Sequence, residues 1–212
     1  MRLLRAKKPK AHKTARDLQR EATRAKLMEA ARKLFSEYGY EGVSVTDIGK
    51  EAGVSHAMIY ANFSDKAGLL YEIVRENNAP QLPAAQKAAQ SSGNAIDRIM
   101  KVLGVWAKYD LADPELLAVM QAYSWTWSDQ MEVDNIEERD MHTNILSALV
   151  DEGVANSEFA SQLDPDVAAE ALFAIYTWGL RLAVFGDVSP AGCIKRLRPQ
   201  VELLLGLGDT SA

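Results

Sequence analysis

The stretch that decides the fold of this chain is Gly53-Val54-Ser55-His56-Ala57-Met58-Ile59-Tyr60-Ala61-Asn62-Phe63. Gly53 permits a sharp turn because glycine tolerates a positive φ, and Val54 can fill the angle between the flanking helices. We expect Ser55 to be the N-cap of a short helix that turns Ile59 and Phe63 inward. No acidic residue lies between Ser55 and Phe63. The stretch therefore predicts a turn and a short helix whose exposed face carries no negative charge.

A second short helix is predicted just before this turn. Ser44 and Asp47 are spaced as in a capping box, in which Ser44 accepts from an amide three residues on and Asp47 lies in the first turn. A longer helix precedes it from about Ala15. Its apolar residues recur at steps of three and four, and Gly39 can end it; the stripe consists of Leu27, Ala30, Ala31, Leu34, Phe35 and Tyr38.

Two short capped helices joined by a glycine turn, behind a longer helix, form the helix-turn-helix arrangement. The second helix of such a pair enters the major groove of DNA with its N-terminal side chains. The pattern alone also allows a plain helical hairpin inside a bundle. DNA binding is thus the functional hypothesis that this segment favours.

Charge is distributed unevenly over the 212 residues. Residues 1–26 hold ten Lys and Arg against two acidic residues, whereas residues 79–212 hold nine basic and nineteen acidic ones, within a net charge of -5. Such asymmetry indicates one end that faces a polyanion and a separate acidic body. We expect residues 1–14 to be a flexible basic arm, because they show no helical periodicity.

The rest of the chain is helical in period, and no run of alternating β-branched residues predicts a strand. The expected fold is all-α: a helix-turn-helix head over residues 15–64, then a helical body over residues 65–212 that opens with a connecting helix at 65–79. Pro80 and Pro83 are expected to end that connecting helix. Two apolar helices are predicted near the C-terminus, at 164–185 and about 190–205.

The head carries an ordered set of short motifs over about residues 23–77. These are Ala31-Arg32-Lys33-Leu34-Phe35, Tyr38-Gly39-Tyr40, Ser44-Val45-Thr46-Asp47-Ile48, Glu51-Ala52-Gly53-Val54-Ser55, Ile59-Tyr60, and Phe63 with Lys66 and Leu69-Leu70. In this combination the head resembles the DNA-binding domain of the tetracycline-repressor (TetR) family of bacterial regulators.

The resemblance implies how the head would bind DNA. It makes Tyr60 and Lys66 phosphate binders, with Thr46 also touching the backbone, while His56, Ala57 and Met58 would face base edges beside Ser55. Ala57, Ala61, Asn62 and Ala67 depart from the residues frequent in the family, as does Gly49, which lowers local helix preference. The basic arm could compensate for a lost phosphate contact.

The resemblance also implies a homodimer through the last two helices and a small-molecule effector in the body. A sizeable, largely apolar effector would suit an aromatic and methionine-rich cavity. Ordinary core packing is the better explanation for any one of these residues, whereas for the set the two explanations are balanced. The expected lining consists of Met100, Trp106, Met120, Tyr123, Trp127, Tyr176 and Trp178, with Ser124, Thr126 and Arg181 as polar anchors.

Other chemistry finds little support in the sequence. We predict no enzyme, no cofactor and no metal site, because the three histidines are scattered and no phosphate loop or nucleophile motif occurs. Glu138 and His142 lie four apart in an acidic run, which we interpret as a solvated helix face. Cys193 is expected to be a core residue. Without a secretory signal or an expected membrane helix, a cytoplasmic protein is predicted.

We therefore expect a homodimeric regulator that binds a near-palindromic double-stranded operator and is released by its effector. We expect the regulator to be a repressor, and an activator is the alternative that the sequence leaves open. An enzyme and an adaptor whose head has lost its affinity for DNA are the alternatives from other classes. Tyr60, Lys66 and the basic arm argue against the adaptor.

Overall fold

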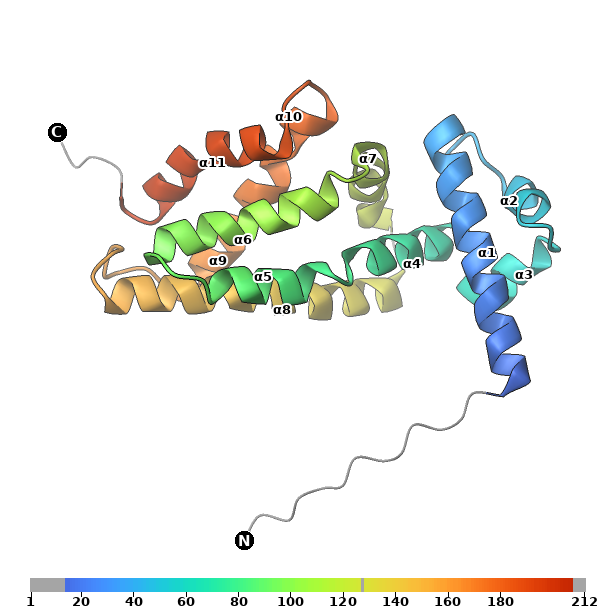
Figure 1. Cartoon of the computed structure of the whole chain (residues 1–212), viewed down its shortest axis with the longest axis horizontal. Helices are drawn as coiled ribbons and strands as arrows, with labels where there is room; N and C mark the ends of the chain where they lie inside the picture. Colours follow the sequence, from blue (N-terminus) through green and yellow to red (C-terminus); the bar gives the residue numbers. More distant parts are fainter. Residues whose placement is uncertain (1–13, 127, 208–212) are drawn as a thin grey trace, which may run out of the picture. The chain divides into compact units, whose positions relative to one another are not determined.

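A computed structural model describes residues 14–126 and 128–207 of the chain. Within these residues every regular element is helical (Figure 1), so the all-α prediction is confirmed. The predicted basic arm and Trp127 lie outside the described residues, apart from Thr14. The chain divides into two compact units, and the boundary falls between Leu69 and Leu70. This boundary is five residues beyond the predicted one.

The N-terminal unit contains α1 (Ala15–Tyr38), α2 (Val45–Glu51), α3 (Ala57–Phe63) and the first residues of α4 (Lys66–Asn78). Leu27, Ala31 and Phe35 of the predicted stripe are buried, but Tyr38 is 64% exposed. Tyr40 replaces it in the core, with its ring 5.1 Å from that of Phe35. Tyr38 is the last residue of α1, and after the chain turns at Gly39 it is Tyr40 that packs on Phe35.

The C-terminal unit contains the remainder of α4 and the helices that follow it. These are α5 (Gln81–Ala89), α6 (Ala95–Asp110), α7 (Pro114–Tyr123), the 3-10 turn η1 (Ser124–Thr126), α8 (Asp129–Ala155), α9 (Pro165–Gly179), α10 (Arg181–Val184) and α11 (Pro190–Leu204). Helix α6 packs against α5, α8 and α11, and α9 packs against α8 and α11 (Figure 1). Cys193 is fully buried in this core.

Two boundaries differ from those expected in this unit. Helix α4 does end before Pro80, but Pro83 lies in the first turn of α5, where a missing amide N–H costs no hydrogen bond. The helix predicted over 164–185 stops at Gly179, and the short α10 follows Leu180.

The segment Pro165–Val184 is long and apolar enough to cross a membrane, with a mean hydropathy of 1.4. It is interrupted at Leu180, however, and Ala168, Leu172 and Tyr176 are buried in the core of this unit. Those features are typical of a core helix in a globular protein.

Candidate nucleic-acid interface and ligand cavity

Helix α3 is fixed to α1 by contacts at its C-terminal end. The Arg24 guanidinium donates to the carbonyl oxygen of Asn62 and lies 4.3 Å from the centroid of the Phe63 ring. Arg20 Nε donates to Asn62 Oδ1 at 3.4 Å, and Asn62 Nδ2 donates to the Met58 carbonyl at 2.7 Å. The buried Ile59 and Phe63 complete the attachment. Asn62, which departs from the family pattern, therefore ties α3 to α1.

The turn between α2 and α3 follows from three local features. Ser44 and Asp47 form the predicted capping box, with the Ser44 hydroxyl accepting from Asp47 N–H at 3.2 Å. Gly53 has a φ of 66°, a conformation that favours glycine. Gly49 packs so tightly against the turn that a Cβ there would lie 2.9 Å from His56 N. Gly49 is thus required by packing, whatever it costs in helix preference.

The start of α3 differs by one residue from the prediction. His56 occupies the N-cap position and makes no capping hydrogen bond with its side chain. Ser55 Oγ instead accepts from Ala57 N–H at 3.3 Å. The hydroxyl still stabilises the helix start, from one residue further out.

The residues that the sequence predicts to contact DNA on α2, on α3 and in the turn between them are mostly exposed, and we call them the candidate DNA-binding face. Thr46, at the start of α2, is exposed, and Tyr60 is 55% exposed on α3. Met58 is half-buried, and the other three are exposed: Ser55, His56 and Ala57. An imidazole, two hydroxyls and a phenol give this face few hydrogen-bonding groups for reading bases.

Lys66 has a role that the sequence did not predict. Its ammonium donates to the carbonyl oxygens of Tyr40 at 2.9 Å and Val43 at 3.0 Å, and lies 4.1 Å from the centroid of the Tyr40 ring. Two of its three donors are therefore already used to hold the loop between α1 and α2. Only one remains for the phosphate contact that the family resemblance implies.

The C-terminal unit holds a cavity of about 590 Å³, which is within the range of small-molecule sites. Of the predicted lining, Trp106, Met120, Tyr176 and Trp178 lie on its wall, as do the proposed anchors Ser124 and Arg181. Met100 does not; it is buried in the core and serves packing. Tyr123, on the last turn of α7, does not line the cavity either.

Aromatic rings gather on one side of this cavity. The Trp106 ring is fully buried and meets the rings of His142, Phe173 and Tyr176 edge-on, at centroid distances of 5.2, 6.1 and 5.5 Å. Phe173 and Tyr176 are successive positions on one face of α9. The resulting wall can bind a flat or bulky apolar group.

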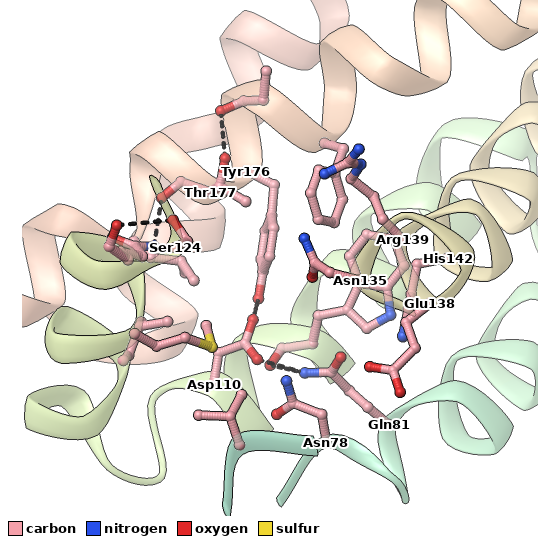
Figure 2. A pocket seen from close by; sticks show the side chains of 18 of the residues that line it. Asn78, Gln81, Asp110, Ser124, Asn135, Glu138, Arg139, His142, Tyr176 and Thr177 are labelled. Carbon is pink, nitrogen blue, oxygen red and sulfur yellow. Dashed lines mark hydrogen bonds between the residues drawn. The ribbon is translucent and has the colours of Figure 1, made fainter. Parts of the chain in front are cut away.

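Asp110, at the end of α6, is the most buried carboxyl group of the cavity. Figure 2 shows it between Tyr176 and Gln81, which donate to it at 2.5 Å and 2.6 Å. Burial raises the pKa of Asp110, and the two hydrogen bonds oppose that rise only in part. Burial also raises the pKa of Tyr176 well above its usual value.

A second polar group lies on α4 and α8. Arg75 Nε donates to Glu138 at 2.9 Å, and burial raises the pKa of Glu138 despite this partner. Burial lowers the pKa of His142, one turn further along α8, which favours its neutral form. The acidic run that holds Glu138 was predicted to be a solvated face. Most of its carboxylates are exposed, but Glu138 and His142 are half-buried and line the cavity. The four-residue spacing of Glu138 and His142 was the sequence signal that could have placed them together.

Apart from Ser124 and Arg181, the polar lining was missed from sequence. It also includes Asn78, Gln81, Asn135 and Arg139, contributed by α4, α5 and α8 (Figure 2). Among the described residues, no group of three His, Cys, Asp or Glu side chains is placed to hold a metal ion.

Comparisons with known proteins agree with this geometry. Residues 27–73 match the model of the bacterial regulatory proteins of the tetR family. The transcriptional repressor AcnR of Corynebacterium glutamicum is 27% identical over 157 residues, which cover 71% of this chain and 73% of AcnR. The fatty acid metabolism regulator protein of Bacillus subtilis is 23% identical over 154 residues, covering 69% and 76%.

Solved structures share the fold over most of the chain. The TetR-family regulator PfmR of Thermus thermophilus has a TM-score of 0.65 at 27% identity, covering 92% of this chain and 97% of its own. FadR of Bacillus subtilis in complex with stearoyl-CoA has a TM-score of 0.68 at 21% identity, covering 87% and 99%. The second likeness shows the fold alone.

An all-α chain with a capped helix pair and an exposed α3 in its N-terminal unit is a helix-turn-helix transcriptional regulator. The family match covers that helix pair. Residues 27–73 therefore belong to a DNA-binding domain of the tetR family of bacterial regulatory proteins.

Proposed function

We propose that this chain is a homodimeric repressor that binds a near-palindromic operator through α3 and leaves it when a small molecule occupies the cavity. The observation that carries the proposal is the pairing, in one chain, of an exposed α3 in a tetR-family domain with a 590 Å³ cavity in the C-terminal unit. We place its action in the cytoplasm, where bacterial operators are.

The DNA contacts divide by chemistry. Tyr60, Thr46 and the remaining donor of Lys66 would bind phosphates, while Ser55, His56, Ala57 and Met58 would face the bases. Because that reading face is sparse, the dimer's half-site spacing and DNA shape would supply much of the specificity.

Exposed apolar side chains support the dimer. Trp178 and Phe185 are 73% and 71% exposed, and Leu203 on α11 is 73% exposed. Monomeric proteins rarely expose many large apolar side chains on neighbouring elements. A second copy packed on α9 and α11 would cover them.

The effector would act by binding the non-operator conformation better. A tenfold loss of operator affinity requires a difference of only about 1.4 kcal/mol in effector binding between the two conformations. FadR of Bacillus subtilis, of the same fold, was solved in complex with stearoyl-CoA, which supports a ligand for this chain. We propose a largely apolar effector with polar anchors.

Selection of bound sites from random duplex DNA tests the proposal, with the intact chain and its Tyr60→Ala variant. We expect the wild-type chain to enrich a near-palindrome and Tyr60→Ala to enrich it weakly or not at all. Tyr38→Ala is the matched control, because Tyr38 is an exposed tyrosine of the same unit outside α3. Failure of the wild type to enrich any palindrome would overturn the proposal.

A further inference from the structure

Asp110 is a buried carboxyl group whose partners are both neutral. Tyr176 OH donates to one of its oxygens and Gln81 Nε2 to the other. In residues 14–126 and 128–207 no Lys, Arg or His forms an ion pair with it. Each oxygen also keeps a lone pair that neither donor uses. A buried carboxylate with no countercharge is costly, so a cation that reached it would be strongly favoured.

The other charges that line the cavity already have partners or lie at its rim. Arg75 is paired with Glu138 at 2.9 Å. Arg139 lies 3.7 Å from Glu132 and, in Figure 2, well apart from Asp110. Arg181 is exposed and stacks on the rings of Trp178 and Phe185, at 4.9 and 4.8 Å from their centroids. Asp110 therefore stands as the one lining carboxyl, among the described residues, that lacks a positive partner.

The walls beside Asp110 suit a cation with apolar substituents. Tyr176 and Trp106 lie on the wall next to its carboxyl group, and Phe173 is one turn away on α9. The faces of aromatic rings attract cations, and more strongly when water is excluded. His142 faces Trp106, and burial lowers its pKa, which favours the neutral form beside a bound cation.

We propose that the effector is a lipophilic organic cation whose positive charge is held at Asp110 and whose apolar groups pack on the Trp106–Tyr176 wall. This inference rests on the proposed function, because it names the chemistry of the effector in that same cavity. It narrows the largely apolar effector with polar anchors to one that carries a single positive charge.

Tetraphenylphosphonium and tetraphenylborate test the sign of the charge, because the two ions match in shape and differ in sign. Their binding to the intact chain, without DNA, is followed by tryptophan fluorescence and by calorimetry. We expect the phosphonium to bind at least tenfold more tightly than the borate. Asp110→Asn should weaken phosphonium binding roughly tenfold or more, since a buried charge pair is lost. The exposed Asp151→Asn on α8 should leave it unchanged.

Each result bears on the proposal. Preference for the borate, equal affinity for both ions, or no binding of either overturns the cation inference, even if Asp110→Asn does not fold. An undiminished affinity in a folded Asp110→Asn variant also overturns it. None of these results affects the enrichment of a palindrome by the chain. The selection experiment therefore tests the proposed function independently of the cation inference.

Discussion

Lys66 shows how one residue can serve the fold of the DNA-binding unit. Its ammonium bridges the carbonyls of Tyr40 and Val43. Hydrogen bonds from a charged donor contribute more than neutral ones, and the contact with the Tyr40 ring adds to them. Lys66 is therefore a structural residue in addition to any contact with phosphate.

We expect Lys66→Met to lower the free energy of unfolding by about 2 kcal/mol, because two carbonyls lose a charged donor. Urea denaturation followed by circular dichroism measures the change. Lys33→Met is the control: Lys33 pairs with Glu51 at the surface, where a salt bridge contributes little because solvent screens it. Equal stability of the Lys66 variant and wild type would refute the structural role.

Asp110 makes stability depend on pH in a direction set by its burial. Its pKa is raised in the folded chain, so folding favours the protonated acid. This contribution is fully present below the unfolded pKa of about 3.9 and is lost as the pH rises through the folded pKa. An asparagine side chain cannot ionise. Asp110→Asn should thus gain stability relative to wild type as the pH rises from about 4 to about 8.

Urea denaturation at a series of pH values measures that difference, with Asp151→Asn as the control for removing an exposed carboxylate. The control should show little change in the difference across the series. If the wild type instead gains stability over Asp110→Asn with rising pH, the hydrogen bonds from Tyr176 and Gln81 favour ionised Asp110. That result would contradict a raised pKa of Asp110 in the folded chain.

At the scale of helices, close packing around Gly49 in the α2–α3 pair opposes the helix propensity that alanine would add there. A Cβ at Gly49 would lie 2.9 Å from His56 N and 3.0 Å from the Val54 carbonyl oxygen, both backbone atoms that cannot easily move. Helix propensity would gain up to ~1 kcal/mol from alanine, whereas overpacking costs roughly 1–3 kcal/mol. We therefore expect the steric cost of a Cβ at Gly49 to exceed the gain in helix propensity.

We expect Gly49→Ala to destabilise the chain and to weaken DNA binding, because α3 would be displaced. Gly104→Ala in α6 is the matched control: a Cβ there meets nothing within 4 Å, so propensity alone should stabilise it by about 0.5–1 kcal/mol. Thermal unfolding of both variants gives the comparison. Stabilisation by Gly49→Ala would contradict the packing described for the turn.

Local signals in the sequence were enough to predict the head. The Ser44–Asp47 capping box, Gly39 and Gly53 act over a few residues, and each is confirmed by the structure. Tyr38 was misplaced because Tyr40, beyond the turn at Gly39, packs on Phe35 in its stead. The break at Leu180 was missed because the apolar pattern continues past it.

The cavity could be predicted only in part. Trp106 and Tyr176 were singled out by residue type, yet Asp110, Gln81 and Arg75 come from three helices whose packing no local pattern reveals. Glu138 was assigned to solvent because acidic residues surround it in sequence. Glu138 instead accepts a hydrogen bond from Arg75, which is 63 residues away along the chain and which no local pattern connects with it.

For the whole molecule, the exposed apolar residues of α9 to α11 predict self-association. Leu203→Glu should shift the chain toward monomer, because burying an unpaired carboxylate in an interface is costly. Leu18→Glu is the control, since Leu18 is a 55% exposed leucine on α1. Sedimentation velocity at micromolar concentration measures the effect. A wild type that sediments as a monomer would remove the proposed interface.

The most direct test of the account is a titration of the selected palindromic duplex with the intact chain, beside a duplex in which one half-site is scrambled. We predict two chains per intact duplex, and an affinity lowered by more than about a hundredfold when one half is scrambled, since several base contacts are lost together. Tyr60→Ala should weaken binding to both duplexes. One chain per duplex, with equal affinity for the intact and scrambled sites, would contradict recognition of an operator by paired α3 helices.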